Sequence, residues 1–141
     1  RYRFLDGKIV LYDRIDTAFT YLNKNTELFK VVNVPMVDDL EAYCELASKT
    51  AEEQKDYFTG PLGNDVFQCS PMPWVTYTHI SHTNSGKKDN ATLLFDWGKY
   101  YEKDGKIMIP ISVQAHHSFV DGLHIGKFVE KLETYFKECK V

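Results

Sequence analysis

The segment HHSFVDG, at residues 116–122, indicates the fold more strongly than any other part of the chain. Before it, residues 106–115 form a long apolar run that is typical of a buried strand. After it, from about Leu123 to Cys139, apolar residues recur with the spacing of an amphipathic helix. A side chain at such a strand–helix junction can be held by the scaffold and still be open to a ligand. The two histidines are therefore candidate functional residues.

Several chemical interpretations of this segment are open from the residues alone. Histidine is the natural general base near neutral pH, which favours an acid–base role for one of the pair. His117, Asp121 and His124 could also be metal ligands, but their spacing is not that of a common zinc site, so we expect no metal. Asp121 also has a structural interpretation, as the residue that caps the following helix.

Composition restricts the class of protein. The chain has 141 residues, of which 43% are hydrophobic, which predicts one modest core and a single domain over residues 1–141. Its 17 basic and 20 acidic side chains do not indicate a nucleic-acid binder. No apolar run approaches the ~20 residues of a membrane span. The three cysteines are widely spaced and form no CxxC pair, so we expect a cytoplasmic protein.

Apolar periodicity predicts a chain in which strands dominate and helices occur in two places, which is the α+β class. Asp104-Gly105 separates two apolar runs and predicts a hairpin turn. Pairing of the first two strands in a second hairpin is also expected. Strands are predicted at residues 2–5, 8–12, 19–22, 28–32, 66–69, 75–81, 93–101 and 106–115.

The two predicted helices are both amphipathic. The first begins at Asp38, with Glu41 three residues later as in a capping box. Its apolar face is predicted to hold Leu40, Cys44, Ala47 and Ala51. The core stripe of the last helix is predicted to hold Ile125, Phe128, Val129, Leu132, Phe136 and Cys139.

The HHxxxDG pattern followed by an amphipathic helix resembles the CoA-dependent acyltransferase superfamily, which includes chloramphenicol acetyltransferases, dihydrolipoamide acyltransferase cores and peptide-synthetase condensation domains. The sequence segments around this pattern resemble the chloramphenicol acetyltransferase family in particular. SPMPW at residues 70–74 is similar to the family's SxxPW segment, GKYY at residues 98–101 to its GKY element, and residues 19–29 to its FTxFHxETETF stretch. Residues 109–117 resemble the strand that leads into its histidine. The order and spacing of these blocks fit over nearly the whole chain.

This resemblance implies a fold and a mechanism. The fold would be a mixed β-sheet with flanking helices, representing the C-terminal two-thirds of the family's domain. His117 would be the general base that takes the proton from the acceptor's hydroxyl as it attacks the thioester of acetyl-CoA, with no covalent acyl-enzyme. Ser70 would stabilise the oxyanion. Asp121 would be structural, paired with an arginine from an N-terminal region that is not in this chain.

The resemblance also implies binding roles and an assembly. Phe29 would belong to the acceptor pocket, whereas Trp74 and Tyr100 would lie along the CoA path. The family works as a homotrimer with its site between subunits, uses acetyl-CoA as co-substrate without a cofactor, and acetylates chloramphenicol, a reaction that underlies antibiotic resistance. Plainer interpretations stay open: Ser70 as a turn residue before a proline, Phe29 as core packing, and Trp74 as part of a rigid corner.

The chain departs from the family pattern at several positions. Asn23 and Asn25 replace a histidine and a glutamate of the FTxFHxETETF stretch, Asp96 stands where a small hydroxyl residue is common, and His82 stands where an apolar pocket residue is usual. These differences predict an acceptor pocket that differs from the family's. Two other functions are therefore kept: a truncated, non-catalytic remnant, and a related acyltransferase with another acceptor, such as a lipoyl or carrier-bound substrate.

Overall fold

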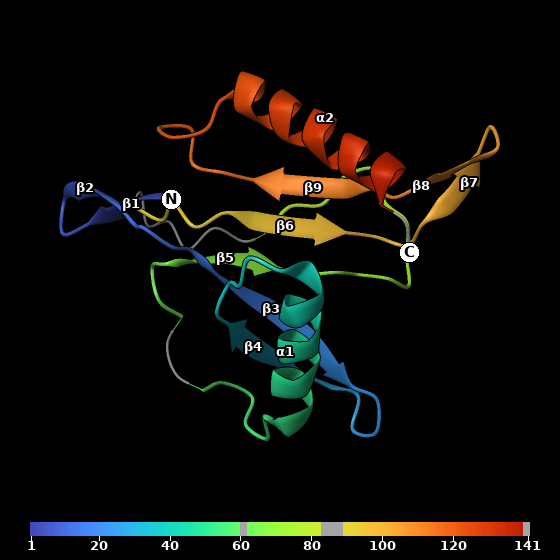
Figure 1. The fold of residues 1–141 in the computed structure, drawn as a ribbon, viewed down its shortest axis with the longest axis horizontal. Coiled ribbons are helices and arrows are strands. Elements are labelled where there is room, and N and C mark those ends of the chain that lie inside the picture. Colours follow the sequence, from blue (N-terminus) through green and yellow to red (C-terminus); the bar gives the residue numbers. More distant parts are fainter. Residues whose placement is uncertain (60–61, 83–88, 140–141) are drawn as a thin grey trace.

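A computed structural model describes residues 1–59, 62–82 and 89–139 (Figure 1). Within these residues the chain forms a five-stranded sheet, two small hairpins and two helices. The strands are β1 (Tyr2–Leu5), β2 (Lys8–Leu11), β3 (Asp16–Asn23), β4 (Leu28–Val34), β5 (Val66–Cys69), β6 (Leu94–Trp97), β7 (Tyr101–Lys103), β8 (Lys106–Met108) and β9 (Ile111–Gln114), and the helices are α1 (Leu40–Glu53) and α2 (Gly122–Glu138).

The central sheet is mixed, with strand order β4-β3-β5-β6-β9. β3 is antiparallel to β4 and parallel to β5, β5 is parallel to β6, and β6 is antiparallel to β9. The predicted class, a mixed sheet with flanking helices, is therefore confirmed. The predicted β1–β2 hairpin is confirmed as well.

Both helices pack on the same face of this sheet (Figure 1). The strand register aligns Phe19 with Val32 and Cys69, and Cys69 with Phe95. Phe19 and Val32 belong to the small core under α1. Phe95 contacts Phe128 of α2, with ring centroids 5.4 Å apart. Because these aligned residues point to one side, the residues between them point to the opposite face, which no helix of the described chain covers.

The N-cap of the first helix lies one residue later than predicted. Its N-cap is Asp39, whose carboxylate accepts a hydrogen bond from the Ala42 amide at 2.8 Å, so the predicted pairing of Asp38 with Glu41 is wrong. Two consecutive aspartates precede the helix, and sequence spacing alone did not distinguish them.

The buried face of α1 also differs from the predicted one. Ala47 and Ala51 pack on the core as expected, but Leu40 and Cys44 are exposed. Tyr43 and Leu46 take their place. The hydroxyl of Tyr43 lies 2.6 Å from the hydroxyl of Thr17 on β3, and this contact fixes which side of the helix meets the sheet.

The two long strands predicted at residues 93–101 and 106–115 are each broken in two. Pro110 has no amide hydrogen and interrupts the ladder between β8 and β9. Opposite it, the Gly98 amide donates to the Pro110 carbonyl at 3.0 Å. The chain at Gly98 is crowded, since a Cβ atom there would lie 2.7 Å from the carbonyl oxygen of Val75. The turn beyond the break is as predicted: Asp104 and Gly105 both have positive φ, as a two-residue hairpin turn requires.

The strand predicted at residues 75–81 does not form. The Val75 amide donates to the Met72 carbonyl in a turn, and the Val75 carbonyl accepts from the Lys99 amide at 2.7 Å. This segment is therefore irregular chain.

The last helix lies close to its prediction. α2 has Asp121 as N-cap and Cys139 as C-cap. Of the predicted core stripe, Ile125, Phe128 and Leu132 are half-buried, whereas Val129, Phe136 and Cys139 are exposed. Part of the apolar side of α2 is thus uncovered in the single chain.

Candidate active site

His117 lies on the loop between β9 and α2, with its side chain exposed. Its Nδ1 atom is 3.2 Å from the carbonyl oxygen of Val120. A carbonyl oxygen can only accept a hydrogen bond, so Nδ1 carries the hydrogen in this contact. The lone pair of the neutral ring is then on Nε2. The geometry gives His117 the tautomer that a general base needs.

His116 has a different environment. Its Nδ1 accepts a hydrogen bond from the Ser118 amide at 3.2 Å, and its ring meets the ring of Phe4 edge-on at 5.1 Å. It also contacts Phe119. The first histidine of the pair therefore anchors the loop to the first strand, and the second is presented to solvent.

Asp121 acts as the cap of α2, as one interpretation of the sequence predicted. Its carboxylate accepts from the amides of Leu123 (3.0 Å) and His124 (3.2 Å). The hydrogen bond from the His124 amide is the main cause that lowers the pKa of Asp121 below its usual value. The Asp121 carboxylate lies 2.7 Å from Nδ1 of the His124 ring, and no arginine of the described chain forms a salt bridge with it.

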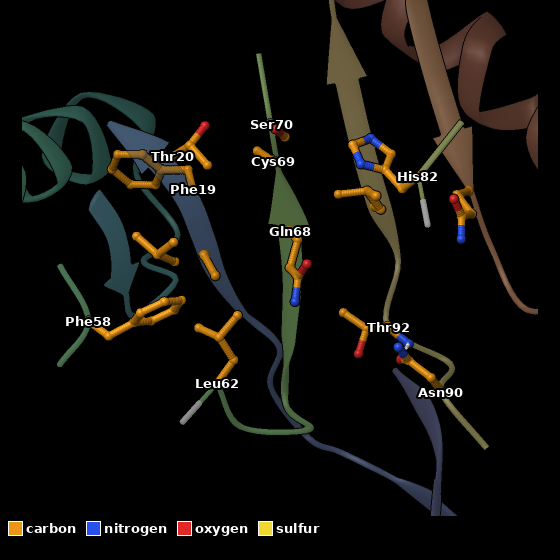
Figure 2. A pocket seen from close by; sticks show the side chains of 14 residues that line it. Phe19, Thr20, Phe58, Leu62, Gln68, Cys69, Ser70, His82, Asn90 and Thr92 are labelled. Carbon is orange, nitrogen blue, oxygen red and sulfur yellow. Dashed lines mark hydrogen bonds between the residues drawn. The ribbon is translucent and has the colours of Figure 1, made fainter. Parts of the chain in front are cut away.

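Ser70 lies directly after β5, where its amide donates to the Phe95 carbonyl at 2.9 Å. It lines a pocket of about 390 Å³ on the face of the sheet opposite the helices (Figure 2). One side of the pocket is mostly apolar and is formed by β3, β4, Phe58 and Leu62. The other side is mostly polar and is formed by β5, β6, β9, His82, Asn90 and Thr92. The side chains that Figure 2 labels include Phe58 and Leu62 on the first side and His82, Asn90 and Thr92 on the second.

A histidine–aspartate pair forms part of the polar side. The Nε2 atom of His82 is 2.9 Å from Oδ1 of Asp96, and the Asp96 side chain is fully buried. The sequence showed both residues as separate departures from the family pattern but did not indicate that they meet. They are 14 positions apart, and no local spacing links them.

The Asp96 carboxylate affects its buried neighbours. Burial raises the pKa of the Cys69 thiol to about 11, and the negative charge of Asp96 acts in the same direction. Burial and then Asp96 also raise the pKa of Tyr77. Both groups are therefore neutral at physiological pH.

Two predicted binding residues lie side by side. The rings of Phe29 and Trp74 meet edge-on with centroids 6.1 Å apart. Phe29 is 41% exposed and Trp74 57% exposed, so neither is a core residue within the single chain. Tyr100 follows β6 and is also exposed. Exposed aromatic rings of this kind are typical of binding surfaces.

The structure does not bring Ser70 and His117 together. β5 and β9 run in opposite directions, so the chain leaves them at opposite ends of the sheet (Figure 1). Ser70 is level with Ser112, two strands away, and normal sheet spacings put it on the order of 12 Å from Gln114. His117 follows three residues after Gln114. The two side chains therefore belong to different surfaces of one chain.

The family model described as chloramphenicol acetyltransferase matches residues 1–133. The chain belongs to the chloramphenicol acetyltransferase family. Among its relatives, a chloramphenicol acetyltransferase of Klebsiella sp is 27% identical over 136 residues, covering 94% of this chain and 62% of the relative. Chloramphenicol acetyltransferase 2 of Escherichia coli is 29% identical over 132 residues, covering 91% and 62%. The chain thus spans a little under two-thirds of these relatives' length.

Solved structures show the same fold. A chloramphenicol acetyltransferase structure superimposes with a TM-score of 0.84 at 26% identity, covering 96% of this chain and 68% of that one. A dihydrolipoamide acetyltransferase (E2p) of Azotobacter vinelandii superimposes with a TM-score of 0.64 at 17% identity, covering 97% and 60%. The second likeness concerns the fold alone.

Two further observations concern membranes and metals. Within residues 1–59, 62–82 and 89–139, no helix combines the length and the apolar character needed to cross a bilayer. In the same residues, no three histidine, cysteine or acidic side chains are placed to hold a metal ion. His117, Asp121 and His124 are instead engaged in the loop and helix-cap contacts described above.

Proposed function

We propose that the protein transfers an acetyl group from acetyl-CoA to a hydroxyl of chloramphenicol or of a similar small molecule. Membership of the family supports the reaction class. The observation that carries the proposal is the Nδ1 contact of His117 with the Val120 carbonyl, because it leaves Nε2 available as the base.

In the proposed reaction, Nε2 of His117 takes the proton of the acceptor's hydroxyl as that oxygen attacks the thioester carbonyl. The carbonyl electrons move to the oxygen and form a tetrahedral oxyanion. When this intermediate collapses, the carbon–sulfur bond breaks and the CoA thiolate leaves with the proton from the imidazolium. The products are the acetyl ester and CoA, and the histidine returns to its neutral form.

Ser70 is proposed to donate its hydroxyl hydrogen to the oxyanion. Such a donor contributes about 3 kcal/mol to the transition state. The position of Ser70 at the rim of the pocket supports this role. In the Azotobacter vinelandii enzyme, a serine, a histidine and an asparagine have been investigated for their role in the catalytic mechanism, and the asparagine is numbered four after the histidine. In this chain Asp121 likewise follows His117 by four positions.

We infer that the working unit is a homotrimer whose site lies between subunits. Ser70 and His117 lie at opposite ends of the sheet of one chain. A neighbouring copy is therefore needed to bring a base to the pocket. The uncovered apolar residues of α2, Val129 and Phe136, support an assembly in which more of the chain is buried. In it, Phe29 would contact the acceptor, and Trp74 and Tyr100 would line the path of CoA.

The test is the release of CoA thiol by the native full-length protein given acetyl-CoA and a panel of hydroxylated acceptors, chloramphenicol among them. Acceptor-dependent release is expected, and its absence with every acceptor would overturn the proposal. The second candidate is a non-catalytic remnant that keeps the fold, and it predicts no acceptor-dependent release of CoA thiol. An intact mass near 16.4 kDa for the native protein would support the remnant, and a larger mass the enzyme.

A further inference from the structure

The hairpin formed by β1 and β2 lies beside the loop that carries His117. Successive side chains of a strand point to opposite sides, so Tyr2 and Phe4 share one side of β1 and Arg3 lies on the other. The side with the two aromatic rings faces the loop, since both rings contact Phe119 there. One side of β1 can therefore fix the hairpin to the sheet while the other contacts the loop.

Two hydrogen bonds fix the hairpin at the start of β5. The Arg3 side chain is fully buried, and its Nη2 atom donates to the Val66 carbonyl at 2.9 Å. The side-chain amide of Asn64 donates to the Phe4 carbonyl at 2.8 Å. Burying a guanidinium is costly, and a hydrogen bond to a carbonyl oxygen offsets part of that cost. Movement of the hairpin away from β5 would break these bonds, so β1 is a fixed support for the residues that pack on it.

The aromatic side of β1 holds the middle of the loop. The ring centroids of Phe4 and Phe119 are 4.8 Å apart. Tyr2 stacks on the same Phe119 ring at 5.8 Å, with the two planes at 20°. Phe4 also meets the His116 ring edge-on at 5.1 Å. The loop is thus in contact with the fixed strand through two of its residues, and Phe4 contacts both of them.

Phe119 directly precedes the residue whose carbonyl orients the proposed base. The Val120 carbonyl oxygen lies 3.2 Å from Nδ1 of His117. The amides of Phe119 and Val120 both donate to the His116 carbonyl, at 3.0 and 3.1 Å, so this part of the loop is a closed turn. Because the turn is closed, a shift of the Phe119 ring moves the Val120 carbonyl with it. The position of the Phe4 ring therefore affects where His117 presents Nε2.

We propose that Phe4 is a positioning residue for the proposed base, His117. Its ring, packed on Phe119, holds the loop in the place where the Val120 carbonyl orients the imidazole. The inference rests on the proposed function, because Phe4 acts through the base and touches no reacting atom. Phe4 does not occur among the described residues that line the pocket at Ser70, so its role concerns the rate of proton transfer and not the binding of the acceptor.

The first test replaces Phe4 by leucine, which keeps an apolar side chain and removes the ring. In the native full-length protein, Phe4→Leu should lower kcat by roughly 10-fold to 100-fold, because a displaced base takes the proton less effectively, and KM for both substrates should stay within about twofold. Leu5→Ala is the matched control, since Leu5 is the next residue of β1 and points to the opposite side. An unchanged kcat in folded Phe4→Leu, or a change confined to KM, would overturn the proposal.

A double-variant cycle tests whether Phe4 acts through Phe119. Phe119→Leu should lower kcat by a similar factor, and the double variant F4L/F119L should lower it no further, because all three variants lack the same contact. Phe119→Leu also tests the contact from the side of the loop if Phe4→Leu does not fold. Effects that multiply in the double variant would show two independent contributions and would contradict the assignment.

The ring of His117 gives a readout that does not depend on activity. In protein labelled with nitrogen-15 histidine, at a pH at which the imidazole is neutral, NMR shows which ring nitrogen carries the hydrogen. The wild type and Leu5→Ala should carry it on Nδ1, whereas Phe4→Leu should give a mixture of both tautomers. The spectrum of His117→Ala, which lacks the signal, assigns it. If no acceptor is acetylated, the proposed function is wrong, and an unchanged tautomer in Phe4→Leu would separately overturn the positioning role.

Discussion

The Nδ1 atom of His117 lies 3.2 Å from the carbonyl oxygen of Val120, three residues further along the same loop. This contact stabilises one ring tautomer and fixes the direction in which Nε2 is presented. The loop is itself held by His116 against Phe4 and by the capped start of α2. The ring of His117, the proposed base, is therefore oriented by contacts within its own chain.

The first prediction concerns His117. His117→Ala should lower kcat by roughly 100-fold to 10,000-fold, the contribution of a general base, because no other group replaces Nε2. The exposed side chain makes little packing contact, so the thermal midpoint should be nearly unchanged. The measurement is CoA release together with a melting curve. His79→Ala, at another exposed histidine, is the matched control, and retained turnover in His117→Ala would refute the assignment.

The second prediction concerns Ser70. Ser70→Ala should lower kcat by roughly 100-fold to 1,000-fold with little effect on KM, because the lost hydroxyl stabilises the transition state rather than the bound substrates. Steady-state kinetics with both substrates measure this. Ser48→Ala on the exposed side of α1 controls for the substitution itself. A change in KM alone would instead make Ser70 a binding or turn residue.

The third prediction tests whether the site is shared between subunits. Ser70→Ala and His117→Ala should each be inactive alone, whereas purified mixed trimers of the two should recover roughly one third of wild-type activity, since one of the three interfaces in each mixed trimer pairs an intact histidine with an intact serine. The two variants can be co-expressed with different tags and the mixed assemblies purified. If both groups acted from the same chain, the mixture would stay inactive.

The fourth prediction concerns the thiols. Cys69 should react slowly with a thiol reagent at pH 8, because burial and the nearby Asp96 charge raise its pKa to about 11 and little thiolate is present. Cys44 and Cys139 are exposed and should react fast. Following the reaction by mass spectrometry assigns each site. Rapid modification of Cys69 in the folded protein would contradict the buried environment of this side chain.

The fifth prediction concerns Asp121 and pH. Its pKa is lower in the folded than in the unfolded protein, so its stabilising effect is fully present above its usual value and is lost as pH falls through the lowered one. Asp121→Ala should therefore lower the thermal midpoint more at pH 7 than at pH 2.5. Asp38→Ala, at the aspartate that does not cap α1, is the control. An equal decrease at both pH values would show that the carboxylate charge is not responsible.

Elements with local signals could be predicted from the amino-acid sequence without a structure. The Asp104-Gly105 turn, the amphipathic last helix and the Asp121 cap depend on residues within a few positions of one another, and all three were predicted. The family blocks also lie in short segments, so membership could be inferred from them. The break at Pro110 was missed because the apolar pattern runs through it, although a proline in a strand is a known interruption.

Contacts between distant segments emerged only in the folded chain. His82 meets Asp96, Phe29 meets Trp74, and Tyr43 rather than Leu40 faces the sheet, because strand register and helix docking bring these residues together across long stretches of chain. The opposite directions of β5 and β9 likewise separate Ser70 from His117, although both stand in conspicuous motifs. The spacing of residues along the sequence does not indicate the direction of each strand, because that direction is set by the packing of the whole sheet.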